Sequence, residues 1–184
     1  MLINSTEIEQ QIRNWLQQVV IGLNLCPFAA KPYLDNQVRI AISDCRDEAC
    51  LLNDLNDELK NLDAHNPQEV ETTLVVLPDM LGDFYDYNEF LDLAEALLEE
   101  GGWSGTYQIA SFHPHYQFAG TQPEDSENLT NRSPYPVLHL IREASLEKAL
   151  QYYPDPETIP DKNIETVQNL TDAQKKSLFP YLFG

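Results

Sequence analysis

Positive charge is scarce in this sequence: 11 Lys and Arg residues stand against 30 Asp and Glu residues, which leaves a formal net charge of −19. Nucleic-acid-binding proteins use Lys and Arg to neutralise phosphates, and membrane-surface proteins use them to bind anionic lipids. The charge balance therefore argues against both kinds of partner. It favours solubility, and it still allows a small anionic molecule in a local basic pocket.

Long apolar runs and targeting signals are also lacking. No stretch approaches the roughly 18 apolar residues of a transmembrane helix, and residues 1–10 contain no basic start or apolar segment of a secretory signal. Only three cysteines occur, with no Cys-x-x-Cys pair. This usage predicts free thiols in a reducing compartment, and the cytoplasm is the simplest location.

The hydrophobic content of 42% in 184 residues suffices for a folded core. We expect one globular domain over residues 1–184, with residues 154–184 forming a helical extension packed on it. Alternating or continuous apolar residues predict four strands. Their ranges are Val38–Ser43, Thr72–Leu77, Thr106–Phe112 and Tyr135–Arg142.

Apolar residues at helical spacing predict helices before the first strand, between the first three strands, and over Ser145–Tyr153. The predicted N-terminal caps are Thr6 with Glu9, Asp44, Asp86 with Glu89, and Thr171 with Gln174. The element order is αβαβαββα, followed by a helical C-terminal tail. This order predicts the α/β class, with a mixed sheet of about four strands packed by helices and an antiparallel pairing of the last two.

The stretch from Phe112 to Glu143 carries most of the candidate chemistry. It contains three of the four histidines and two arginines, Arg132 and Arg142, and its central part shows almost no apolar periodicity. Connections longer than roughly 12–15 residues are uncommon in compact domains unless they are functional or disordered. We therefore predict the functional site in this loop, with Arg142 beside Glu143 as a structural ion pair.

The His113-Pro114-His115 segment is a candidate transition-metal site. Residues two apart in an extended segment point the same way, so both imidazoles can face one point. With His139 as a third ligand, such a site suits zinc, iron, nickel or copper. The alternatives are surface or structural histidines at 113 and 115, and a hydrogen-bonded core histidine at 139.

Arg132 is the centre of a predicted anion pocket. Its planar guanidinium suits a carboxylate or phosphate, and Tyr116, Asn131 and Ser133 can add hydrogen bonds. His113 is a candidate general acid or base in the same pocket. In the alternative interpretation, the Asn and Ser residues only form turns and Arg132 pairs with a surface acid.

Cys26 is the thiol best suited to nucleophilic chemistry, because it lies at a turn just after the first helix and a nearby histidine can take its proton. The alternative is a small buried hydrophobic residue. Cys45 and Cys50 are interpreted as structural residues on or beside the second helix. Two residues five apart on a helix do not face each other well enough to form a disulfide.

Three stretches resemble a bacterial family of uncharacterised proteins catalogued as domain of unknown function 1415. They read GLNLCPFA, SFHPHYQFAG and NLTNRSPYPVLHLIRE, and they include Cys26, His113, Arg132 and His139. The resemblance covers nearly the whole chain. It implies a single-domain, cytoplasmic bacterial protein and brings no activity, substrate, cofactor or catalytic residue.

Three classes of function remain open from the sequence. The first is an enzyme, a hydrolase or transferase, that acts on a small anionic metabolite in the His/Arg loop. The second is a non-catalytic metal- or ligand-binding protein built on the same loop. The third is an interaction protein with an acidic surface, whose apolar C-terminus FPYLFG docks an unknown protein partner.

Overall fold

The computed structural model describes residues 4–184, and its strands form a four-stranded mixed sheet in the order β1-β2-β4-β3. The strands are β1 (Val38–Ile42), β2 (Thr72–Val76), β3 (Tyr107–Phe112) and β4 (Val137–Arg142). β1 and β2 are parallel, and β4 is antiparallel to both β2 and β3. The predicted α/β class, the mixed sheet and the antiparallel pairing of the last two strands are confirmed.

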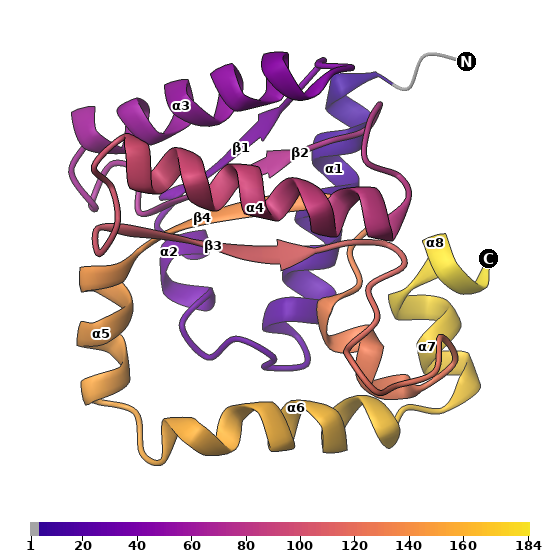
Figure 1. The fold of residues 1–184 in the computed structure, drawn as a ribbon. Helices are drawn as coiled ribbons and strands as arrows, with labels where there is room; N and C mark the ends of the chain where they lie inside the picture. Colours follow the sequence, from indigo (N-terminus) through magenta and orange to yellow (C-terminus); the bar gives the residue numbers. More distant parts are fainter. Residues whose placement is uncertain (1–3) are drawn as a thin grey trace.

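Helices surround the sheet, and Figure 1 shows their arrangement along the chain. The α-helices are α1 (Ser5–Trp15), α2 (Ala30–Leu34), α3 (Glu48–Ala64), α4 (Phe84–Glu100), α5 (Glu143–Gln151), α6 (Ile159–Gln168), α7 (Asp172–Leu178) and α8 (Pro180–Phe183). A π-helix, η1 (Leu16–Ile21), continues α1, and two 3-10 helices are η2 (Ser126–Asn131) and η3 (Pro156–Thr158). The predicted helical tail is confirmed, whereas α2 was not expected.

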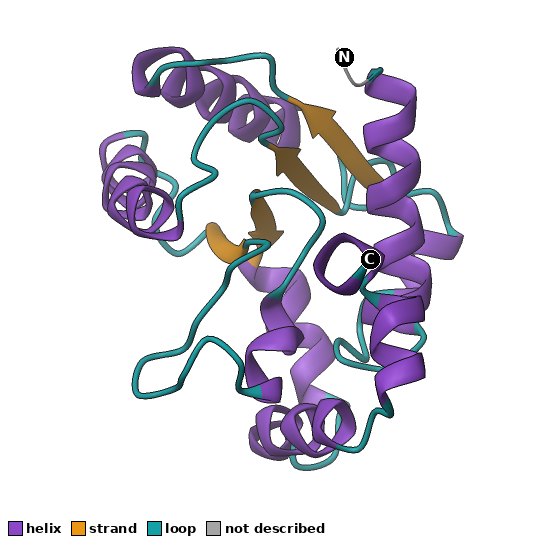
Figure 2. Cartoon of the chain, turned by 90° about the vertical axis from the view of Figure 1, so that its right-hand side faces the viewer, coloured by secondary structure: helices purple, strands orange, loops and turns teal. Residues whose placement is uncertain are grey.

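Both faces of the sheet are covered, as the side view in Figure 2 makes clear. On β2, Val75 faces the core formed with α3 and α4, while Leu74 and Val76 face the core formed with α1 and η1. This alternation is the two-residue period of a strand. The unbroken apolar run Leu74–Val76 therefore fits a central place between two helical layers.

The helix caps lie a few residues away from three of the predicted positions. Asn4 caps α1 through its side chain, and Asp47 and Asp83 cap α3 and α4. Each cap is the residue whose side-chain oxygen reaches a free N–H of the first turn, and several Asp and Thr residues nearby compete for that role in the sequence. The capping box of Thr171 with Gln174 is confirmed.

The C-terminal tail is part of the hydrophobic core that is formed with α1 and η1. Phe179 is fully buried in the cluster that contains α1 and η1. The Tyr181 hydroxyl donates to the carbonyl oxygen of Arg132 at 3.0 Å, and Lys175 Nζ donates to Ser126 Oγ at 2.9 Å. The tail therefore holds the long loop that precedes β4.

Candidate functional site

Three strands end at the same edge of the sheet, because β1, β2 and β3 all run in one direction. The segments that follow β1 and β2 lead into α3 and α4 and touch each other. Arg46 Nη2 lies 3.4 Å from Asp79 Oδ2 across these two segments. Ligands of open α/β sheets bind outside the carboxyl ends of the strands, so this edge is the natural place for a functional site.

His113 lies at this edge, fully buried, with both ring nitrogens in hydrogen bonds. Nε2 donates to the carbonyl oxygen of Leu81 at 2.9 Å, and Nδ1 accepts from the backbone N–H of His115 at 2.9 Å. Burial lowers the pKa of His113 below its usual value, which keeps the ring neutral at pH 7. The geometry therefore gives His113 a structural role and does not support the predicted acid–base role.

Leu81, the partner of His113, adopts a left-handed backbone conformation with φ of 55°. A left-handed residue with a side chain costs about 1–2 kcal/mol, so the surrounding structure must hold it there. The hydrogen bond from His113 and the packing of Leu81 against the α3–α4 core supply that support.

The side chain of Asn128 holds the long loop together through hydrogen bonds. It is fully buried, and its Oδ1 accepts from the Phe118 backbone N–H at 2.9 Å and from Thr121 Oγ1 at 3.0 Å. Its Nδ2 donates to the carbonyl oxygen of Gln122 at 2.8 Å. The loop thus folds around a buried amide, which explains how a long segment with little apolar periodicity is ordered.

Arg132 holds two distant parts of the same loop. Its Nε donates to the carbonyl oxygen of Tyr116 at 3.1 Å, and its Nη2 donates to that of Pro123 at 2.7 Å. Burial lowers the pKa of Arg132, although its guanidinium remains charged at any ordinary pH. Among residues 4–184 no carboxylate lies within 4.0 Å of this guanidinium, so the predicted alternative of a surface ion pair is not formed.

Asn131 and Ser133 flank Arg132 and are also engaged by the protein. Asn131 Nδ2 donates to the carbonyl oxygen of Ser111 at 3.0 Å, and its own carbonyl accepts from the His113 backbone N–H at 3.1 Å. Ser133 is fully buried and its hydroxyl donates to the carbonyl oxygen of Tyr135 at 2.6 Å. The structure brings the predicted anion-pocket residues together, mainly as a network that holds the loop.

The three-histidine metal site is not formed. His115 is exposed, and Nε2 of His139 lies 2.6 Å from Thr72 Oγ1 on β2. Within residues 4–184 one group of at least three His, Cys, Asp or Glu residues brings its ligand atoms within 4.8 Å of one another, and it contains no histidine. The geometry therefore does not support His113, His115 and His139 as ligands of one metal ion, since both nitrogens of His113 already have protein partners.

Cys26 is largely shielded and packs against the core around α1 and η1. Burial is the main cause that raises the pKa of its thiol, which favours the thiol over the thiolate. No histidine is among the groups that shift this pKa. The geometry matches a small buried hydrophobic residue and does not support the predicted nucleophile.

Cys45 and Cys50, which the sequence reasoning left as structural free thiols, form a disulfide with a Cα–Cα distance of 5.6 Å. The prediction was wrong because α3 begins at Glu48, so Cys45 lies in the turn after β1 and only Cys50 is helical. The signal in the sequence was Asp47, whose side chain accepts from the backbone N–H of Cys50 at 2.9 Å and marks the helix start.

A carboxylate and a hydroxyl adjoin the disulfide. Asp54 Oδ2 lies 3.3 Å from Cys45 Sγ, and Ser43 Oγ donates to the same oxygen at 2.6 Å. Cys45 is buried, whereas Cys50 is partly exposed at the first turn of α3. The sulfur of Cys45 has no proton in the disulfide, so its contact with Asp54 becomes an S–H···O hydrogen bond only after reduction.

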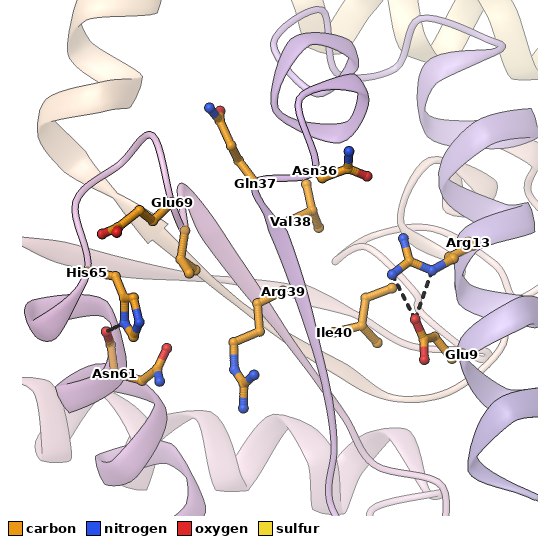
Figure 3. A pocket seen from close by; sticks show the side chains of 11 residues that line it. Glu9, Arg13, Asn36, Gln37, Val38, Arg39, Ile40, Asn61, His65 and Glu69 are labelled. Atoms are coloured by element: carbon orange, nitrogen blue, oxygen red, sulfur yellow. Dashed lines mark hydrogen bonds and ion pairs between the residues drawn. The ribbon is translucent and has the colours of Figure 1, made fainter.

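A polar groove of about 320 Å³ lies at the opposite end of β1, near the amino end of the strand. Figure 3 shows Arg39 and His65 on one side of this strand and Arg13 with Glu9 on the other. Both arginines are already paired, since Arg13 binds Glu9 at 2.7 Å and Arg39 binds Glu58 at 2.7 Å. The groove therefore provides no uncompensated positive charge for an anion.

The fold and the site define a class: an α/β protein with helices on both faces of a mixed sheet and a disulfide at the carboxyl end of its first strand. The family model described as "Protein of unknown function (DUF1415)" matches residues 7–177, and the chain belongs to this family. Searches of curated proteins and of solved structures found no match. Within residues 4–184, no helix is both long enough and apolar enough to cross a membrane.

Proposed function

We propose that this protein performs thiol–disulfide exchange at Cys45–Cys50. The observation that carries the proposal is the position of the disulfide between a parallel strand and the N-terminus of α3, with Asp54 Oδ2 3.3 Å from Cys45 Sγ. A helix N-terminus stabilises negative charge on sulfur, which is the form that reacts.

The two sulfurs differ in exposure, and this difference decides which of them is attacked first. An external thiolate reaches the partly exposed Cys50 and forms a mixed disulfide with it, and the buried Cys45 leaves as a thiolate that takes up one proton. Asp54, whose Oδ2 lies 3.3 Å from Cys45 Sγ, is the side chain placed to deliver that proton. A second thiolate of the same external dithiol then releases Cys50, so two electrons pass to the protein and the dithiol becomes a disulfide.

The test is a redox titration in mixtures of reduced and oxidised dithiothreitol, with free thiols counted by alkylation and mass measurement. We expect a reversible two-electron transition with a midpoint above roughly −300 mV, because structural disulfides lie below about that value. Asp54→Asn removes the charge beside Cys45 and is expected to shift the midpoint. Cys26→Ser is the matched control and leaves the transition in place.

Two results would contradict the exchange proposal. One is a disulfide that stays oxidised until the most reducing mixtures, with a midpoint well below about −300 mV. The other is an identical midpoint in the wild type and in Asp54→Asn, which would make the carboxylate irrelevant to the sulfur chemistry. In Cys45→Ser and Cys50→Ser the transition disappears by design, so these variants only calibrate the thiol count.

A second candidate is the binding of a small anion at Arg132, which keeps the ligand class expected from the sequence. The specific observation is that this guanidinium donates to backbone carbonyl oxygens and, within residues 4–184, forms no ion pair with a carboxylate within 4.0 Å, although the charge of Glu124 acts on it from further away. The hydrolase or transferase hypothesis then rests on a ligand still to be identified, since His113 has no free ring nitrogen.

Thermal unfolding in inorganic phosphate tests the anion candidate. We expect phosphate at tenfold excess over its dissociation constant to stabilise the wild type by about 1.4 kcal/mol. Arg132→Lys keeps the charge and retains part of the response, whereas Arg132→Met loses it. Arg46→Met, which alters an exposed arginine, serves as the control; equal responses in all four proteins would exclude a site at Arg132.

A further inference from the structure

We infer that reduction of the Cys45–Cys50 disulfide creates a zinc-binding site made of Cys45, Cys50 and Asp54. The inference rests on the proposed function in one respect, namely that the disulfide can be opened. The three side chains are the group within residues 4–184 whose potential ligand atoms lie within 4.8 Å of one another. Thiolate and carboxylate are both ligand types that Zn²⁺ takes in proteins.

The distance between Asp54 and Cys45 fits a shared metal ion. Zinc lies about 2.3 Å from sulfur and about 2.0–2.2 Å from a carboxylate oxygen, so a tetrahedral site places these two ligand atoms about 3.5 Å apart. Asp54 Oδ2 and Cys45 Sγ are already separated by 3.3 Å in the disulfide form. Only the two sulfurs have to move, to a separation of roughly 3.8 Å, once the bond between them is broken.

The neighbouring groups favour a cation at this point. Ser43 Oγ donates to Asp54 Oδ2 at 2.6 Å, which orients the carboxylate as outer hydrogen bonds do in metal sites. Asp44 and Glu48 are exposed next to the cysteines, and the whole chain has a net charge of −19. Three protein ligands leave a fourth position, which water can fill because Cys50 is partly exposed.

The chemistry makes zinc binding and the disulfide mutually exclusive. A water-soluble phosphine breaks the S–S bond, is itself oxidised to the phosphine oxide with oxygen from water, and leaves two thiols. Zinc then displaces both thiol protons and binds the two thiolates. The oxidised protein lacks both sulfur ligands, and the metal-loaded protein resists oxidation. The site is therefore a redox-controlled metal site.

The experiment compares oxidised protein with protein reduced by the phosphine and freed of it under anaerobic conditions. Zinc is titrated against a chromophoric chelator, and thiols are counted in the same samples. We expect one zinc per reduced chain and none per oxidised chain, together with thiolate-to-metal charge-transfer absorption when cobalt(II) replaces zinc. Asp54→Asn is expected to weaken zinc binding at least about tenfold, and each Cys→Ser variant more than that.

Matched controls lie on the same helix and elsewhere in the chain. Asp57→Asn changes an exposed acid of α3 close in sequence to Asp54, and Cys26→Ser removes the remaining thiol; both are expected to bind zinc as the wild type does. If the two thiols appear on reduction but zinc does not bind, or if Asp54→Asn binds it unchanged, the metal site is wrong and exchange stands. If no thiols appear under the phosphine, both proposals fail.

Discussion

Replacing Arg142 by methionine is expected to lower the free energy of unfolding by about 3 kcal/mol. Arg142 lies at the end of β4, and its Nη2 donates to the carbonyl oxygens of Leu62 and His65 at 2.8 Å and of Val70 at 2.9 Å. Hydrogen bonds from a charged donor contribute about 1.5–3 kcal/mol each, and the three acceptors here share one nitrogen.

The position of Arg142 explains why the loss is large. Leu62 and His65 belong to the end of α3, where carbonyl oxygens lack helical partners and a positive charge is favourable. One side chain therefore ties the end of α3 and the turn before β2 to β4, which is distant in the sequence. The predicted ion pair with Glu143 is not formed, although the structural role of Arg142 is retained.

Urea unfolding at pH 7 measures this effect. Methionine keeps the apolar stem of the side chain and removes every hydrogen-bond donor. The decrease in the free energy of unfolding therefore measures the lost hydrogen bonds rather than a new cavity. Arg142→Lys is expected to lose less, because an ammonium keeps the charge but not the planar fork. Arg46→Met is the control, and its exposed ion pair at 3.4 Å predicts a change within about 0.5 kcal/mol. Equal stability of Arg142→Met and Arg46→Met would contradict the account.

Acidification from pH 7 to pH 4.5 is expected to destabilise the wild type by about 2 kcal/mol more than the His139→Gln variant. The Thr72 hydroxyl donates to the carbonyl oxygen of Leu140 at 2.6 Å, so it can only accept from His139, whose Nε2 carries the proton. Burial lowers the pKa of His139 to about 4, from about 6.5 in an unfolded chain.

The direction in which stability changes with pH follows from the pKa values of His139 in the folded and unfolded chains. Between about pH 6.5 and pH 4 the unfolded chain binds a proton at residue 139 that the folded chain does not, so stability falls as the pH falls through this range. A fully shielded ring would lose about 2.4 kcal/mol between pH 7 and pH 4.5. The expected value is somewhat smaller because the side chain retains partial exposure.

Urea unfolding at the two pH values separates His139 from the many carboxylates, which all variants share. Glutamine can donate to Thr72 Oγ1 without titrating, so His139→Gln should show the shallower pH dependence. His115→Gln alters an exposed histidine and is expected to follow the wild type. Parallel pH profiles for all three proteins would mean that His139 is not held neutral in the folded state.

The loop from Phe112 to Glu143 was recognisable from the sequence as a special segment, but its role was not. Histidine, asparagine and arginine are suited both to ligands and to internal hydrogen bonds. Asn128 is fully buried and bonded, and Arg132 binds two carbonyl oxygens of the loop itself. Whether a polar atom faces a ligand or a backbone carbonyl depends on contacts between residues far apart in the chain, which spacing alone does not contain.

The cysteines illustrate the same limit at shorter range. The separation of Cys45 from Cys50 suggested two residues on one helix, whereas the cap at Asp47 places the helix start between them. Helix α3 begins three residues later than a cap at Asp44 implies. Cys45 therefore lies outside the helix, where it can form a disulfide with Cys50. Asp54 then joins this pair because one further turn of α3 returns its side chain to the same side.

By itself the sequence determined the strands, the main helices, the α/β class and the antiparallel pairing of β3 with β4, because the periods of apolar residues and the lengths of the connections are local properties. Only the tertiary structure decided which polar groups are satisfied internally. Both nitrogens of His113 are bonded and the disulfide of Cys45 meets Asp54 because the strand ends bring separate loops together at one edge of the sheet.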